Sequence, residues 1–186
     1  MSKLSGKQKQ KQREKERKEK EKRYLQKQQQ LRLVIRKGDD QSLSTNCTSL
    51  TSNDDLSFIE DLKKVLKAHD NGVGLAANQI GVTKRAFVMY PLKDKEWINI
   101  LINPVIIEKS EETIEIEEGC LSYPGISAST KRYNKIKLQY LDELFNEIIE
   151  EFEGFNAIVV QHEIDHLNGI SIHKNKWIEL GKPNLE

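Results

Sequence analysis

The chain has 186 residues, of which 37% are hydrophobic and 32% charged, the size of one domain or of one domain with a tail. No apolar run is long enough to span a membrane, and no apolar segment follows the charged N-terminus. We therefore expect neither a transmembrane helix nor a secretory signal. The chain has two cysteines, Cys47 and Cys120, and no predicted secretory signal. We therefore expect both to be free thiols in a reducing compartment, and hence a cytoplasmic location.

The formal net charge of +1 conceals two oppositely charged parts. Residues 1–30 hold 12 Lys/Arg and 4 Glu, a balance of +8, whereas the rest of the chain holds 18 Lys/Arg and 25 Asp/Glu, a balance of −7. The large apolar residues of this first part are Leu4, Tyr24 and Leu25, too few to offset the entropy of ordering it. We expect a charged tail over residues 1–30, either disordered or a lone solvated helix, and a globular domain over residues 31–186.

Several segments of the globular domain have patterns typical of strands and helices. Leu33-Val34-Ile35 predicts a short strand. Apolar residues at helical spacing predict a helix that begins after Asn53-Asp54-Asp55 and ends at Asn71-Gly72. Further strands are predicted at 86–90, 98–107, 113–117 and 136–140, and residues 145–153 fit a strand or a helix about equally well. Runs of strands with two separate helices indicate an α+β fold.

The second predicted helix, between Gly154 and Gly169, contains an H-E-x-x-H motif. Residues four apart lie on the same face of a helix, so the rings of His162 and His166 can converge on one metal ion. Glu163 projects from a neighbouring face, where it can act as general base for a metal-bound water. Apolar residues on the stripe of the two histidines indicate that the motif faces a core rather than solvent: Phe155, Ile158 and Val159.

Two other segments contain candidate functional residues. Cys120 lies in the segment Glu117-Glu118-Gly119-Cys120, at the end of the predicted strand 113–117. A thiolate there would complete a Cys/His/His ligand set with a fourth position for water. The alternative is a small buried cysteine with a packing role. The segment Gly72–Gln79 is rich in Gly and Ala, which lets a backbone approach a substrate, and the amide of Gln79 could donate to a developing oxyanion.

In this order, Gly72–Gln79, Glu118–Ser122 and Gln161–His166 resemble the three motifs of the peptide deformylases. The resemblance covers about residues 31–172. It implies an α+β fold in which antiparallel sheets enclose the metal-binding helix. It also implies a metal-dependent hydrolase that removes the formyl group from the N-terminal formyl-methionine of nascent polypeptides.

The resemblance further implies roles for individual residues. The metal ligands would be Cys120, His162 and His166, with Glu163 as the general acid and base. The oxyanion donors would be Gln79 and the backbone N–H of Leu121, and the backbone of Gly74 would pair with the extended peptide. The pocket for the methionine side chain would be formed by Val73, Ile116, Phe155, Ile158 and Val159, all of which are apolar, as a thioether requires.

The identity of the metal stays open from the ligands alone, because one thiolate and two imidazoles suit Zn, Fe(II), Ni and Co about equally. The resemblance favours Fe(II). The chain also departs from the family: the segment after Pro124 lacks an arginine often found there, and only residues 171–186 follow the metal-binding helix. Arg132 is present and could pair with Glu118.

Two other functions fit parts of the sequence. In a zincin-like metalloprotease the third ligand would come from downstream, where His173 is the only histidine. Alternatively, the body is a retired scaffold and the basic tail binds RNA. Because the deformylase substrate emerges from the ribosome, we also hypothesise that residues 1–30 attach the enzyme to ribosomal RNA; a merely solubilising tail is an equally good interpretation.

Overall fold

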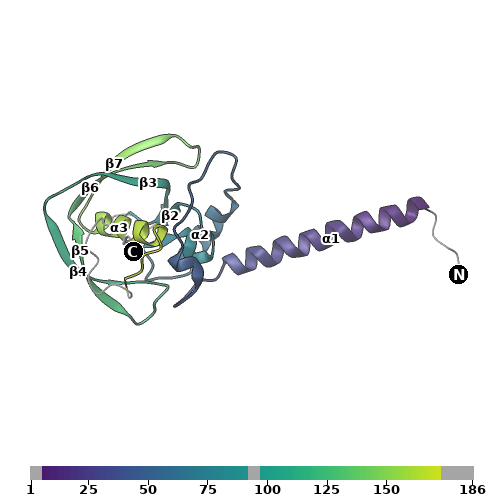
Figure 1. The fold of residues 1–186 in the computed structure, drawn as a ribbon, viewed down its shortest axis with the longest axis horizontal. Helices are drawn as coiled ribbons and strands as arrows, with labels where there is room; N and C mark the ends of the chain where they lie inside the picture. Colours follow the sequence, from purple (N-terminus) through teal and green to yellow (C-terminus); the bar gives the residue numbers. More distant parts are fainter. Residues whose placement is uncertain (1–5, 92–96, 173–186) are drawn as a thin grey trace.

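The computed structural model describes residues 6–91 and 97–172, and Figure 1 shows their arrangement. Its helices are α1 (Gly6–Arg32), α2 (Ser57–Lys67) and α3 (Phe155–Leu167), with two 3₁₀ turns, η1 (Gln41–Ser44) and η2 (Ala77–Ile80). The strands are β1 (Gly74–Ala76), β2 (Ala86–Met89), β3 (Asn99–Lys109), β4 (Thr113–Gly119), β5 (Ser127–Tyr133), β6 (Lys135–Leu141) and β7 (Glu147–Glu153).

The strands form two antiparallel sheets. One has five strands in the order β1-β2-β3-β6-β7, and the other is the hairpin of β4 and β5. The pairing of β3 with β6 shifts in register between Ile102 and Val105, next to Asn103, which has a φ of 50°. Such an irregularity bends a strand. The bent sheet and the hairpin lie on different sides of α3 (Figure 1), which confirms the expected α+β fold with antiparallel sheets.

Two groups of buried apolar side chains hold these elements together. In one, residues of α3 such as Val160 and Leu167 pack against residues of the five-stranded sheet such as Phe87 and Leu138. In the other, α2 packs on the opposite face of β1 and β2. Helix α3 is therefore buried on most sides, so its polar residues need partners within the protein.

The secondary structure differs from the sequence-based prediction at several places. The predicted strand Leu33-Val34-Ile35 is wrong: these residues form a turn after α1, and Leu33 and Val34 are exposed. Strands β1 and β5 were not predicted; β1 lies in the Gly/Ala-rich segment that was expected to be a tight loop. The ambiguous segment 145–153 forms β7, an edge strand paired with β6. The predicted strands around β2, β3, β4 and β6 and the two predicted helices are confirmed.

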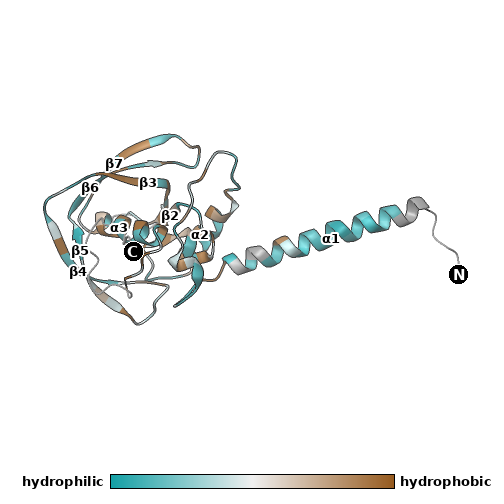
Figure 2. Cartoon of the chain, viewed as in Figure 1, coloured by the Kyte–Doolittle hydropathy of each residue, from teal (hydrophilic) through white to brown (hydrophobic). Residues whose placement is uncertain are grey.

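Helix α1 extends away from the rest of the protein (Figure 1), and Figure 2 shows that it is hydrophilic along most of its length. The tail was expected to be either disordered or a lone solvated helix, and its described residues form a helix. Its last residue, Arg32, pairs with the buried carboxylate of Asp61 on α2, with 3.1 Å between Nε and Oδ2. Among the described residues, no helix combines the length and the apolar character needed to cross a membrane.

Candidate metal centre and catalytic pocket

Helix α3 places the two histidines of the H-E-x-x-H motif side by side. Gly154, with a φ of 58°, forms the turn from β7 into the helix, and its N–H donates to the carbonyl of Asn134 at 2.8 Å. A positive φ is accessible to glycine without strain. The ring centroids of His162 and His166 are 4.9 Å apart in an edge-to-face arrangement. The predicted convergence of the two rings is present.

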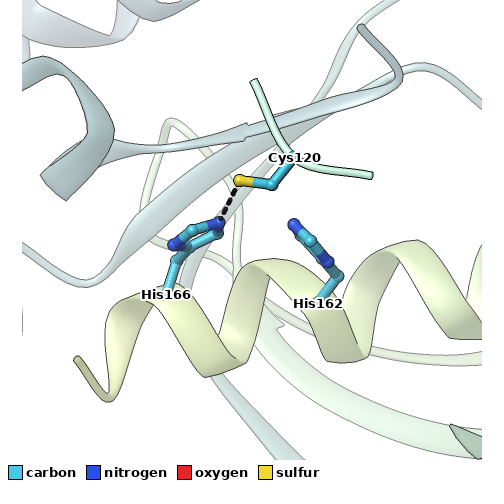
Figure 3. Close-up of side chains that lie close together, drawn as sticks. All are labelled: Cys120, His162 and His166. Atoms are coloured by element: carbon cyan, nitrogen blue, oxygen red, sulfur yellow. Dashed lines mark hydrogen bonds between the residues drawn. The ribbon is translucent and has the colours of Figure 1, made fainter. Parts of the chain in front are cut away.

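Cys120 approaches the two rings from the end of β4 (Figure 3). Its Sγ lies 3.2 Å from Nε2 of His166. One potential ligand atom from each of Cys120, His162 and His166 can be chosen so that all three lie within 4.8 Å of one another. Cys47 and Cys120 are both free thiols, so no disulfide removes Cys120 from this cluster.

A buried network orients His162. Its Nδ1 lies 2.6 Å from Oε2 of Glu118. Burial raises the pKa of Glu118, but the hydrogen bonds from His162 and Arg132 outweigh burial and lower that pKa to about 2. An ionised carboxylate only accepts hydrogen bonds, so Nδ1 of His162 is the donor and Nε2 is left to face the cluster.

Arg132, on β5, holds the other side of this network. Its Nε is 2.6 Å from Oε1 of Glu118, as the sequence suggested, and its Nη1 is 2.5 Å from Oδ2 of Asp165. Thr130 also donates to Glu118. The roles of Asp165 and Thr130 were not predicted. Asp165 lies inside the H-E-x-x-H motif, and a carboxylate on a buried helix is a signal that a charged partner is required.

Glu163 is buried close to the histidines, and its Oε2 has no hydrogen-bond partner among residues 6–91 and 97–172. Without a metal ion, burial raises the pKa of Glu163 to about 7, although the neighbouring His162 opposes the shift. A Cβ atom on Gly74 would lie 2.5 Å from Oε1 of Glu163. A larger residue at this position of β1 would therefore require the carboxylate of Glu163 to move.

Gln79, at the end of the Gly/Ala-rich segment, points its amide at the same cluster. Its Oε1 accepts a hydrogen bond from the N–H of Ala76 at 2.8 Å, which leaves Nε2 as the group that faces Cys120. The Nε2 atom is 3.6 Å from Sγ of Cys120 and 3.1 Å from the hydroxyl of Ser122. Ser122, whose role was not predicted, thus helps to fix the amide.

A pocket of about 430 Å³ opens onto these groups. It lies beside β1 and β4, each of which is at the edge of its sheet. The five residues expected to bind a methionine side chain all line it: Val73, Ile116, Phe155, Ile158 and Val159. Gly74, Gln79, Cys120, Leu121, His162 and Glu163 line it as well.

The donor set fits a divalent metal ion. A thiol and two imidazoles are typical ligands of Zn, Fe, Ni and Co, and three protein ligands leave a further position for water or substrate. Within the described part of the chain, the buried Oε2 of Glu163 has no hydrogen-bond partner, which leaves it available to a water held beside the cluster. His173, the ligand required by the zincin alternative, lies outside the described residues.

Comparison with known proteins gives one consistent family. Residues 33–177 match the family "Polypeptide deformylase". Peptide deformylase 1 of Clostridium perfringens is 43% identical over 73% of this chain and 92% of its own length. The crystal structure of peptide deformylase from Thermotoga maritima aligns with a TM-score of 0.64 and 39% identity, covering 76% of this chain and 95% of that one. A class I type b peptide deformylase from Acinetobacter baumannii with bound Met-Ala-Ser aligns with a TM-score of 0.67 and 30% identity, covering 75% and 95%.

Proposed function

This chain belongs to the polypeptide deformylase family and is a hydrolase that acts on formyl-peptides, and we propose that it removes the formyl group from the N-terminal formyl-methionine of nascent polypeptides with a divalent metal ion. The observation that carries the proposal is the convergence of Cys120, His162 and His166 beside the buried carboxylate of Glu163, one oxygen of which has no hydrogen-bond partner among the described residues. The apolar pocket next to this cluster supports methionine as the side chain bound.

Cys120, His162 and His166 would hold the metal ion. When bound, the ion would supply Lewis acidity and lower the pKa of a coordinated water to about 7. Glu118 keeps the ring of His162 in the orientation that this role needs, because it accepts the Nδ1 proton. We propose Fe(II) as the native metal, and metal analysis of anaerobically purified protein tests this choice against Zn, Ni and Co.

Glu163 would act as the general acid and base. Its carboxylate is buried beside His162 and has one oxygen free of hydrogen bonds, so it can accept a proton from the attacking water. The formyl carbon then becomes tetrahedral, and Glu163 returns the proton to the amine that leaves. The formyl oxygen would accept hydrogen bonds from Nε2 of Gln79 and the backbone N–H of Leu121.

The substrate backbone would lie between the two sheets. Both β1 and β4 border the pocket and have a free edge, and an extended peptide can add to such an edge through main-chain hydrogen bonds. Gly74 on β1 would provide this pairing. Side chains of a strand alternate between its two faces, so only the methionine need enter the apolar pocket.

Formate release from formyl-Met peptides tests this function. We expect the metal-loaded enzyme to release formate from formyl-Met-Ala-Ser and to leave the internal peptide bonds intact. Acetyl-Met-Ala-Ser is the matched control, since the added methyl group occupies the space beside the reacting carbon. Cleavage of internal peptide bonds without formate release would favour the zincin-like alternative instead.

We further propose that the enzyme works in the cytoplasm and attaches to the ribosome through residues 1–30. The charge of +8 over these residues supports this idea, because ribosomal RNA is rich in phosphate. Deletion of residues 1–30 should leave the deformylation of short peptides unchanged and reduce co-sedimentation with ribosomes at low salt. Unchanged co-sedimentation would make residues 1–30 a solvated tail.

A further inference from the structure

The lysines of α1 are not spread evenly around the helix. Lys11, Lys15, Lys18 and Lys22 are separated by four, three and four residues, so at about 100° per residue they fall within about 60° of one another. All four side chains are exposed. We call these four residues the lysine stripe. Successive members are about 4.5–6 Å apart along the helix axis.

The other faces of α1 have a different charge pattern. The face opposite the lysine stripe also holds four exposed cations, Arg13, Arg17, Lys20 and Lys27, and Glu16 lies at its border. The other three glutamates lie outside the stripe, with Glu14 and Glu21 on one side of it and Glu19 on the other; Glu14 pairs with Lys18 at 3.0 Å and Glu19 with Arg23 at 3.3 Å. Exposed pairs of this kind are worth little, so the stripe stays available to an external anion.

The lysine stripe continues toward the body of the protein. Lys18 and Lys22 line a cleft of about 720 Å³ between α1 and the body. Arg32 and Arg36 line the same cleft, together with the carboxylates of Glu21 and Asp55, and Arg32 also pairs with Asp61. Cations thus outnumber carboxylates along the cleft, which leads from the stripe on α1 to the globular domain.

The lysine stripe fits the backbone of a nucleic acid better than a membrane surface. Helices that lie in a membrane interface combine a basic face with a broad apolar face. Among residues 10–27 of α1, Tyr24 and Leu25 are the only large apolar side chains, too few to form a broad apolar face. A row of lysines without an apolar face instead suits the repeated negative charges of a polynucleotide backbone.

We propose that the lysine stripe binds the phosphate backbone of RNA. This inference rests on the function proposed above, since it names the surface through which attachment to ribosomal RNA would act. It requires no base contacts, so binding should be independent of sequence and strongly dependent on salt.

Two variants of the full chain with equal net charge test the proposal. The first carries Lys11→Gln, Lys15→Gln, Lys18→Gln and Lys22→Gln, and the second carries Arg13→Gln, Arg17→Gln, Lys20→Gln and Lys27→Gln. Glutamine has nearly the helix propensity of lysine and arginine, so α1 should persist in both, which circular dichroism checks. The probe is a short RNA duplex, and affinity is measured at several salt concentrations.

We expect the first variant to bind RNA at least about ten-fold more weakly, with the slope of log affinity against log salt reduced by about 3, since each lost phosphate contact removes 0.7–0.9. The second variant should change the slope by less than about 1. Equal losses in both variants, no RNA binding by the wild type at low salt, or tighter binding to phosphatidylglycerol vesicles than to RNA would each overturn the proposal.

Formate release from formyl-Met-Ala-Ser, measured on the same three proteins, separates this proposal from the proposed function. The lysine stripe does not line the catalytic pocket, so all three proteins should hydrolyse the peptide equally. An inactive wild type that still binds RNA through the stripe would contradict the enzyme and leave the stripe intact. An active wild type whose two variants lose equal RNA affinity would contradict the role of the stripe and leave the enzyme function intact.

Discussion

The contact between Gly74 and Glu163 links the edge of a sheet to the proposed general base. Glycine provides the space that the carboxylate fills, since a Cβ atom would lie 2.5 Å from Oε1. The φ of Gly74 is not positive, so an alanine there would be limited by this contact and not by backbone strain. The sequence alone shows a Gly/Ala-rich turn at this place and does not reveal which group needs the space.

Gly74→Ala should therefore destabilise the protein because Glu163 has to move. In a Glu163→Ala background the same substitution should cost much less, with a coupling free energy of about 0.5–3 kcal/mol. Urea unfolding of the four metal-free proteins measures this coupling. Gly119→Ala is the control, since its Cβ would meet no atom within 4 Å. An equal cost of Gly74→Ala in both backgrounds would show that the contact has no energetic consequence.

Cys120→Ser should weaken metal binding, because a hydroxyl is a harder and far less acidic ligand than a thiol. Cys47→Ser makes the same chemical change at the buried cysteine that lies outside the ligand cluster, so it should keep its metal. Elemental analysis of the purified variants compares the two. Full metal content and activity in Cys120→Ser would make Cys120 a packing residue.

At the level of whole elements, β5 shows where sequence patterns fail. Its buried residues include Thr130 and Arg132, which are polar because they bind Glu118, so the strand lacks the alternating apolar pattern that identified β4 and β6. The opposite error occurred at Leu33-Val34-Ile35, where the apolar run finds no partner strand. The convergence of His162 and His166 was predictable because both residues belong to one helix and lie four residues apart.

Because the side chain of Arg132 on β5 is buried, its replacement should have a large effect on stability. Arg132→Met should destabilise the protein by about 3–5 kcal/mol, because Glu118 and Asp165 lose their shared partner. Lys131→Met, at the exposed neighbouring position, should change stability by less than about 0.5 kcal/mol. Denaturant unfolding of metal-free protein excludes any contribution from metal binding. Similar stabilities of the two variants would show that the network is dispensable.

The basic helix α1 and the proposed catalytic pocket lie in separate parts of the protein. Helix α1 extends away from the domain that holds the pocket (Figure 1), and the lysine stripe and the metal centre share no residues. The sequence predicted this separation from composition, because a segment with few apolar residues cannot join a core. It could not predict the cleft between α1 and the body, which depends on how the two parts meet.

The proposed role of Glu163 is to transfer protons beside a metal ion held by Cys120, His162 and His166. Glu163→Gln tests this role, since glutamine has the same shape and cannot accept the proton. Metal content and formate release from formyl-Met-Ala-Ser are measured on the same anaerobic preparations. We predict wild-type metal content and a loss of about 10²–10⁴-fold in kcat. Wild-type metal content with near wild-type formate release would contradict the account.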